Sequence, residues 1–358
     1  MEELLPLPRR FSFLTIPFPS CYTLPIIICE VFCMIPSIIT RHTAKEDWPG
    51  IRTSIRTAIA ESLGMSPDRL TPAKNTFEEI DRYTAYGLTH IKLRYHVLDD
   101  EWATGILVLP NAPAEKPRAV LTIHGTNGTT GKYGMLDLAG RPNRAYAIEL
   151  AQQGFATFSP DQYGFGEDML DPALRAQFDS FYTRYPAWSL TGRRLLGHVR
   201  ALDVLDQLDI IRHDGYGVMG NSLGGHAAFY VAAFDERIRS AVLSTGISPH
   251  ITNVYRNLRK DPPFEPAVDR ATALTGHPPW EYNELLALCA PRAVLCIEPI
   301  NDPYNPYTAA TIACVQSAWE VYRLLDATQN LSMHIHGDGH DTVPAVRRFA
   351  YTWLAEHL

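Results

Sequence analysis

Two hydrophobic patterns divide the chain, and together they predict its secondary structure. Between residues 77 and 109, apolar and polar residues alternate with a period of two, as in Ile91–Val97, and Thr104–Leu109 follows a polar turn. This alternation predicts antiparallel strands that bury one face. A helix-like segment, 48–63, precedes them.

From residue 118 onward, short apolar runs alternate with helix-like segments. The runs that predict strands are 118–123, 216–219, 293–297 and 331–336. The segments that predict helices are 144–153, 191–208, 225–234, 306–325 and 344–357. Repeated strand–helix alternation predicts a mostly parallel central sheet flanked by helices on both faces. We therefore expect an α/β fold, with one catalytic domain over residues 46–358.

Two segments rich in aromatic residues interrupt this alternation, at about 167–190 and 247–282. Their aromatic residues are Phe178, Phe181, Tyr182, Tyr185 and Trp188 in the first, and Tyr255, Phe264 and Trp280 in the second. We expect both insertions to form lids over the active site. Aromatic side chains on such loops either line a substrate pocket or pack the lid against the domain, and the sequence leaves both open.

The segment 220–225 reads Gly-Asn-Ser-Leu-Gly-Gly and joins an apolar run to a helix-like segment. G-x-S-x-G between a strand and a helix is typical of a sharp turn that lifts a serine hydroxyl clear of the sheet. Side chains in place of Gly220 and Gly224 would collide in such a turn. The helix start also directs backbone N–H groups at charge that develops beside the serine. We predict that Ser222 is a nucleophile; the alternative is a turn whose serine caps the helix.

A nucleophilic serine needs a base that takes its proton. The candidate is His340, because it lies in a small polar loop after the strand-like run 331–336. His334 and His336 are rivals. Two residues apart in a strand, they share one face, and we interpret both as side chains of the sheet.

The base in turn needs an orienting carboxylate, which is expected after the preceding strand. Asp302 lies on the loop that follows this strand, and Glu298 lies closer to the strand itself. We favour Asp302, because a loop carboxylate can reach a histidine on the next loop. An Asx turn ahead of Pro303 is the alternative role for Asp302.

The combination of these motifs resembles the α/β-hydrolase superfamily, over about residues 76–358. It is most similar to the dienelactone-hydrolase-like and acetyl-xylan-esterase-like branch, which overlaps the prolyl-oligopeptidase-type catalytic domain. The chain order of Ser222, Asp302 and His340 is the order expected of this superfamily. Further matching segments are His124-Gly125, Asp161 with Gly164 and Gly166, the run 285–292 and the glycine–histidine loop near the end. Dienelactone hydrolases proper use a cysteine nucleophile, so a serine here favours ordinary ester chemistry.

The resemblance also implies roles for other residues. In the family, a backbone N–H just after the His-Gly pair joins the N–H of the residue after the serine, so Thr126 and Leu223 would form the oxyanion hole. We interpret His124 as a structural hydrogen-bonding residue, and His226 likewise. Asp161 is expected to shape a turn, with no chemical role.

Composition narrows the possible functions. The chain has 358 residues, 46% of them hydrophobic, and its 32 Lys and Arg against 39 Asp and Glu give a net charge of −7. No basic run is present, so nucleic-acid binding is not expected. Neither metal-ligand spacing of His and Cys nor a P-loop occurs, and the predicted reaction needs no cofactor or metal. We expect the cysteines of the domain, Cys289, Cys296 and Cys314, to be buried free thiols.

Residues 1–45 form an apolar N-terminal extension that the domain does not require. We interpret it either as the result of a misassigned translation start, with Met34 as the true first residue, or as a disordered extension. A membrane anchor and an export signal are the alternatives. Glu30, with Pro25 and Pro36, argues against an anchor, and no clear cleavage site follows. We expect a cytoplasmic protein, with a membrane-anchored or exported one as the alternative.

The sequence thus predicts a serine ester hydrolase whose substrate is a small or carbohydrate-borne acyl ester. A serine peptidase of the prolyl-oligopeptidase type is a second hypothesis, disfavoured because no propeller precedes the domain. A ligand-binding protein on a hydrolase scaffold is a third, disfavoured because all three triad residues are present. The oligomeric state stays open.

Overall fold

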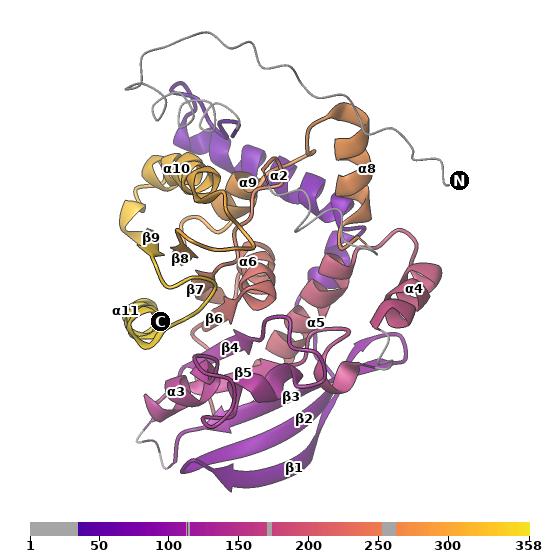
Figure 1. The fold of residues 1–358 in the computed structure, drawn as a ribbon, viewed down its shortest axis with the longest axis vertical. Helices are drawn as coiled ribbons and strands as arrows, with labels where there is room; N and C mark the ends of the chain where they lie inside the picture. Colours follow the sequence, from indigo (N-terminus) through magenta and orange to yellow (C-terminus); the bar gives the residue numbers. More distant parts are fainter. Residues whose placement is uncertain (1–34, 112, 114, 170–173, 253–262) are drawn as a thin grey trace, which may run out of the picture.

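A nine-stranded sheet forms the centre of the computed structural model, which describes residues 35–358 except 112, 114, 170–173 and 253–262. Its strands lie in the order β1-β2-β3-β5-β4-β6-β7-β8-β9 (Figure 1). They are β1 Phe77–Ala85, β2 Leu88–Leu98, β3 Glu101–Leu109, β4 Ala119–Ile123, β5 Ala156–Pro160, β6 Tyr216–Asn221, β7 Ile238–Ser244, β8 Ala293–Pro299 and β9 Leu331–His336.

The sheet has an antiparallel and a parallel part, as the two hydrophobic patterns predict. The β1–β2, β2–β3 and β3–β5 pairs are antiparallel. The β5–β4 pair and all pairs from β4 to β9 are parallel. Strands β4 to β8 are buried along their whole length, apart from Arg239 on β7. Their carboxyl ends therefore meet at one edge, where loops of different strands come together.

Helices cover both faces of the sheet and define two cores. Helices α3 Tyr146–Gln152 and α11 Pro344–His357 pack on one face. Helices α2 Trp48–Ser62, α5 Leu190–Leu205, α6 Leu223–Phe234, α9 Tyr282–Ala287 and α10 Thr308–Leu324 pack on the other. Neighbouring residues of one strand serve different cores, with Val120 in the first and Leu121 in the second. The α/β fold predicted from the sequence is confirmed.

The two aromatic-rich insertions contribute helices α4 Leu174–Arg184 and α8 Pro266–Thr275. The Phe178 ring meets the Phe264 ring edge-on, with 6.4 Å between centroids. The side chains of four aromatic residues are buried in the core: Phe178, Phe181, Trp188 and Trp280. Three others pack against it half-buried: Tyr182, Tyr185 and Phe264. Of the two roles that the sequence leaves open, these rings therefore have the second, because they pack against the domain. Tyr255 lies outside the described residues.

The described chain begins at Ile35, which is buried. The carbonyl of Pro36 accepts hydrogen bonds from Asn283 Nδ2 at 2.7 Å and from Ser317 Oγ at 3.2 Å, which attaches this segment to α9 and α10. Residues 1–34 lie outside the described residues. They include the apolar segment that could alternatively be a membrane anchor or an export signal. In the part of the chain that is described, no helix is both long and apolar enough to cross a membrane. The three cysteines of the domain are buried free thiols, as predicted.

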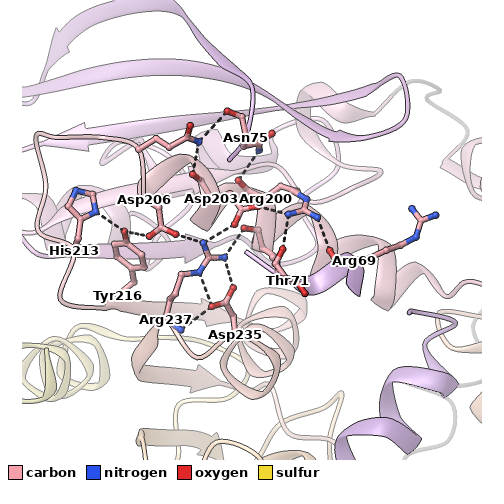
Figure 2. A network of polar contacts seen from close by, with 12 residues as sticks. Arg69, Thr71, Asn75, Arg200, Asp203, Asp206, His213, Tyr216, Asp235 and Arg237 are labelled. Atoms are coloured by element: carbon pink, nitrogen blue, oxygen red, sulfur yellow. Dashed lines mark hydrogen bonds and ion pairs between the residues drawn. The ribbon is translucent and has the colours of Figure 1, made fainter. Parts of the chain in front are cut away.

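A network of charged side chains lies at the edge where the parallel strands begin (Figure 2). Arg237, next to the start of β7, donates to Asp203 Oδ1 at 2.8 Å and to Asp206 Oδ2 at 2.5 Å. Tyr216, at the start of β6, donates from its hydroxyl to Asp206 Oδ1 at 2.7 Å. Because Asp203 and Asp206 lie at the end of α5, the network ties this helix to two strands. It is a structural feature, distant from the carboxyl ends of the strands.

Candidate active site

Ser222 lies at the carboxyl edge of the sheet, as the single residue between β6 and α6. Its backbone has φ 60° and ψ −123°, a conformation that non-glycine residues rarely adopt. Two hydrogen bonds hold it there: the Ser222 N–H donates to the Ser244 carbonyl at 2.9 Å and to Thr245 Oγ1 at 2.8 Å. The strained turn that the motif predicts is thus present, and β7 fixes it.

Glycines are required in this turn because backbone atoms surround it. A Cβ on Gly220 would lie 2.2 Å from the carbonyl oxygen of Gly224. One on Gly224 would lie 2.1 Å from the carbonyl oxygen of Ile123. Neither contact can be relieved by rotating a side chain, so the turn depends on both glycines.

We expect Gly224→Ala to lower the free energy of unfolding by about 2 kcal/mol or more, because β4 or α6 must shift to admit the methyl group. Chemical denaturation measures the loss. Gly50→Ala is the matched control, since a Cβ at this helical position meets nothing within 4 Å; alanine should be neutral there or stabilise by up to about 1 kcal/mol. Equal stability of the two variants would contradict this account of the turn.

The structure places His340 against Asp302. His340 Nδ1 lies 2.7 Å from Asp302 Oδ2, and the two side chains are 14% and 1% exposed. The other oxygen, Asp302 Oδ1, accepts from the Tyr304 N–H at 2.7 Å. The Asx-type turn and the contact with His340 are therefore compatible, because each uses a different oxygen.

The rival residues have other surroundings. Glu298 Oε1 accepts from the Ile247 N–H at 3.1 Å, at the end of β8. His334 and His336 share one face of β9 as predicted, with their rings stacked at 6.1 Å between centroids. His334 also packs on Phe349 of α11. Geometry thus favours Asp302 and His340 over these alternatives.

Long-range contacts hold the His340 loop in place. Asn301 Oδ1 accepts from the Gly339 N–H at 2.9 Å, which joins this loop to the loop of Asp302. On its other side, Arg144 forms an ion pair with Asp341 and donates to the His340 carbonyl at 3.4 Å. The histidine is therefore positioned by segments that follow three different strands.

Ser222 and His340 both line a cavity of about 740 Å³. Among the described residues no hydrogen bond joins the Ser222 hydroxyl to His340; such contacts often tighten only when substrate binds. The remaining lining comes from Asn221, at the end of β6, and from the segments that follow β4 and β8: His124, Gly125, Thr126, Asn127, Gly134, Met135, Arg141, Arg144, Tyr146, Pro303, Tyr304, Pro306 and Tyr307.

The lining of this cavity differs from what the sequence predicts. The described residues of 167–190 and 247–282 contribute nothing to its lining, whereas both insertions were expected to roof it. Sequence reasoning missed Arg141, Tyr304 and Tyr307, which lie in loops that follow the strands' carboxyl ends. Their position was the one signal available in the sequence, because ligands of open α/β proteins bind beyond the carboxyl ends of the strands. Within the described ranges no group of three or more His, Cys, Asp or Glu side chains could hold a metal ion.

Of the two residues predicted for the oxyanion hole, Leu223 directly follows Ser222, and Thr126 lines the same cavity as Ser222. Leu223 is the first residue of α6, so its N–H has no partner within the helix. A Cβ on Gly125, the neighbour of Thr126, would lie 3.4 Å from Ser222 Cβ, which shows how closely this loop approaches the serine.

His124 and Asp161 have structural surroundings, as expected. His124 is buried, and Nε2 accepts from the Gln162 N–H at 3.0 Å while Nδ1 donates to the Gly125 carbonyl at 2.6 Å. Asp161 accepts from the Lys132 N–H at 2.8 Å and forms a buried ion pair with the Lys132 ammonium. A histidine with both nitrogens engaged cannot also serve as the base for Ser222.

Glu167 extends this buried ion pair to the surface. Its carboxylate accepts from Lys92 Nζ at 2.6 Å and from the Tyr133 hydroxyl at 2.8 Å, and lies 3.1 Å from Lys132 Nζ. Burial alone raises the pKa of Glu167, but the hydrogen bonds from Lys92 and Tyr133, with the charge of Lys132, outweigh it and lower the pKa to about 2.

Because the pKa of Glu167 is lower in the folded state than its ordinary value of 4.5, its carboxylate stabilises the fold above pH 4.5, and this contribution is lost as the pH falls toward 2. We expect Glu167→Gln to reduce the free energy of unfolding by about 1 to 2 kcal/mol at pH 7, after allowance for partial exposure. The difference from wild type should shrink between pH 5 and pH 3. Denaturation at several pH values measures it, and a pH-independent difference would refute the electrostatic explanation.

A strained serine turn between a parallel strand and a helix, with a histidine–carboxylate pair from the last two strands, defines the α/β-hydrolase class. A family model described as "alpha/beta hydrolase fold" matches residues 118–295. The chain belongs to the α/β-hydrolase superfamily.

Individual proteins agree with this assignment. The protein YtaP of Bacillus subtilis (strain 168) is 23% identical over 223 residues, which is 59% of this chain and 69% of that protein. A glucuronoyl esterase from Solibacter usitatus has a similar structure, with a TM-score of 0.73, 17% identity and coverage of 90% of this chain and 97% of that one. The methylesterase BT1017 gives a TM-score of 0.64 at 17% identity, over 92% of this chain and 67% of that one. These likenesses show a shared fold.

Proposed function

We propose that the protein is a serine ester hydrolase for a small or carbohydrate-borne acyl ester. The observation that carries the proposal is a single cavity lined by both Ser222 and His340, with Asp302 2.7 Å behind the histidine. Similarity to a glucuronoyl esterase and a methylesterase supports ester substrates, including esters of carbohydrates. A volume of about 740 Å³ is within the usual range for small-ligand sites.

In the first half of the reaction, Ser222 Oγ attacks the carbonyl carbon of the ester, and His340 Nε2 takes the hydroxyl proton. Asp302 accepts a hydrogen bond from His340 Nδ1–H, which fixes the tautomer and stabilises the imidazolium ion. The N–H groups of Leu223 and Thr126 bind the oxyanion, and each such donor contributes about 3 kcal/mol. Collapse of the tetrahedral intermediate breaks the bond to the alcohol, which leaves with the proton from His340.

In the second half, a water molecule gives its proton to His340 Nε2 and attacks the acyl carbon. A second tetrahedral intermediate forms on the same oxyanion donors. It collapses to the free acid, and His340 returns the proton to Ser222 Oγ. The enzyme regains its initial state, so every step uses groups of this chain and water.

A panel of paired substrates tests the proposal with the purified full-length protein. Acetyl esters of sugars and methyl esters of sugar acids are compared with amides of the same acids. We expect turnover of at least one ester class and no measurable turnover of the amides. Faster cleavage of amides would favour the peptidase hypothesis, and tight binding without turnover would favour the ligand-binding one.

A further inference from the structure

The cavity beside Ser222 contains a positive charge that the protein does not neutralise. Among the described residues that line it, Arg141 and Arg144 are the permanently charged groups, and no Lys, Asp or Glu is present. The charge of Arg144 is balanced by its ion pair with Asp341. His340 is paired with the carboxylate of Asp302. Arg141 is exposed and, within the described residues, forms no hydrogen bond or ion pair.

The position of Arg141 is what distinguishes it from an ordinary surface arginine. Some exposed arginines elsewhere have carboxylate partners, as Arg82 has in Glu79 and Arg323 in Glu320, and others, such as Arg348, have none among the described residues, but none of these three lines the cavity. The carboxylate nearest to Arg141 in its own loop, Asp137, accepts instead from the Tyr86 hydroxyl at 2.8 Å and the Ala139 N–H at 2.9 Å. The guanidinium of Arg141 is thus kept available at the wall of the cavity.

Aromatic residues of the loop after β8 form another part of the wall. Tyr304 and Tyr307 both line the cavity and are 62% and 48% exposed. The Tyr304 ring meets the His340 ring edge-on, with 4.8 Å between centroids, so this surface lies directly beside the proposed base. Exposed tyrosines offer a flat apolar face and a polar hydroxyl to a ligand.

We propose that the site selects esters that carry a free carboxylate, and that Arg141 pairs with this carboxylate. The proposal rests on the proposed ester hydrolysis and names its substrate class. A guanidinium presents two parallel N–H donors that match the two oxygens of a carboxylate. One unpaired arginine balances a single negative charge, which favours a carboxylate over a doubly charged phosphate monoester. The carboxylate takes no part in the bonds that form or break.

The carboxylate belongs either to the acyl part or to the alcohol part of the ester, and paired substrates distinguish these sources. For the acyl part, the 4-nitrophenyl hemiester of succinic acid is compared with 4-nitrophenyl butyrate. For the alcohol part, an acetylated glucuronic acid is compared with the matching acetylated glucose. The measured quantity is the ratio of kcat/KM for the charged ester to that for the neutral ester in each pair.

We expect wild type to favour the charged member of at least one pair, and Arg141→Gln to lower that ratio about tenfold to a hundredfold, mainly through KM. Arg141→Lys should retain part of the preference, because a single charge remains without the fork of donors. Added salt should reduce the preference in wild type. Arg348→Gln, an exposed arginine of α11 away from the cavity, is the matched control and should leave both rates unchanged.

Two results would overturn the inference: a wild-type preference for the neutral esters in both pairs, or an unchanged ratio in Arg141→Gln. Either one leaves the proposed hydrolysis intact if the neutral esters are cleaved. Absence of turnover with all four esters in a folded protein would instead reject the hydrolase function itself, and the inference with it.

Discussion

Replacing Ser222 with alanine is expected to lower kcat for ester hydrolysis by about 10⁵- to 10⁶-fold, which leaves only the contribution of the oxyanion donors and of substrate binding. No other hydroxyl can replace that of Ser222, because the strained turn places this residue alone between β6 and α6. Steady-state kinetics with an activated ester measures the loss.

The Ser222→Ala experiment needs a control for folding. The side chain at this position accepts no hydrogen bond that caps α6, so the variant should unfold at the same denaturant concentration as wild type. Ser54→Ala, on the exposed side of α2, removes a hydroxyl that bonds only to the helix backbone and should retain full activity. Residual activity of Ser222→Ala within tenfold of wild type would disprove nucleophilic catalysis by this residue.

Asp302→Asn is expected to lower kcat by about 10⁴-fold with a much smaller change in KM. The carboxylate accepts a hydrogen bond from His340 Nδ1, and an amide that donates instead would stabilise the wrong tautomer, with the proton on Nε2. The fold should survive, because the remaining amide oxygen can still accept from the Tyr304 N–H. Initial rates over a range of substrate concentrations separate kcat from KM.

Glu298→Gln is the matched control for Asp302→Asn, since Glu298 near the end of β8 and Asp302 in the loop that follows are both buried carboxylates. Glu298 accepts from the Ile247 backbone, a bond that glutamine can keep through its carbonyl oxygen. Its kcat should therefore stay within about tenfold of wild type. The opposite outcome, a large loss in Glu298→Gln alone, would assign the orienting carboxylate to Glu298.

The parts of the fold that depend on local pattern could be predicted from the sequence. The period-two run 91–97 lies in β2, and the predicted helix 344–357 agrees with α11 at both ends. The serine turn was predictable because its motif is contiguous and its glycines have a steric reason. Asp302 and His340 could be proposed because each follows its strand in chain order.

The cavity wall could not be predicted in the same way, because it is assembled from distant segments. Arg144 and Asp341 are 197 residues apart in the chain, and no local pattern indicates that they form an ion pair. Because the sequence does not reveal this ion pair, Arg141 and Arg144 look equivalent in it. In the structure, the charge of Arg144 is balanced by Asp341 and that of Arg141 is not balanced by a described residue. The aromatic insertions were ambiguous for a related reason: only tertiary structure shows which surface a ring buries.

The most direct test of the central claim is labelling with a fluorophosphonate, which reacts with activated serines by forming a bond from Oγ to phosphorus and releasing fluoride. Wild type, His340→Ala and the control His357→Ala, at the end of α11, are treated with the probe and analysed by peptide mass spectrometry. The account predicts stoichiometric labelling of Ser222 in wild type and His357→Ala, and loss of labelling in His340→Ala. Equal labelling of Ser222 without His340, or labelling of a different serine in folded wild type, would contradict it.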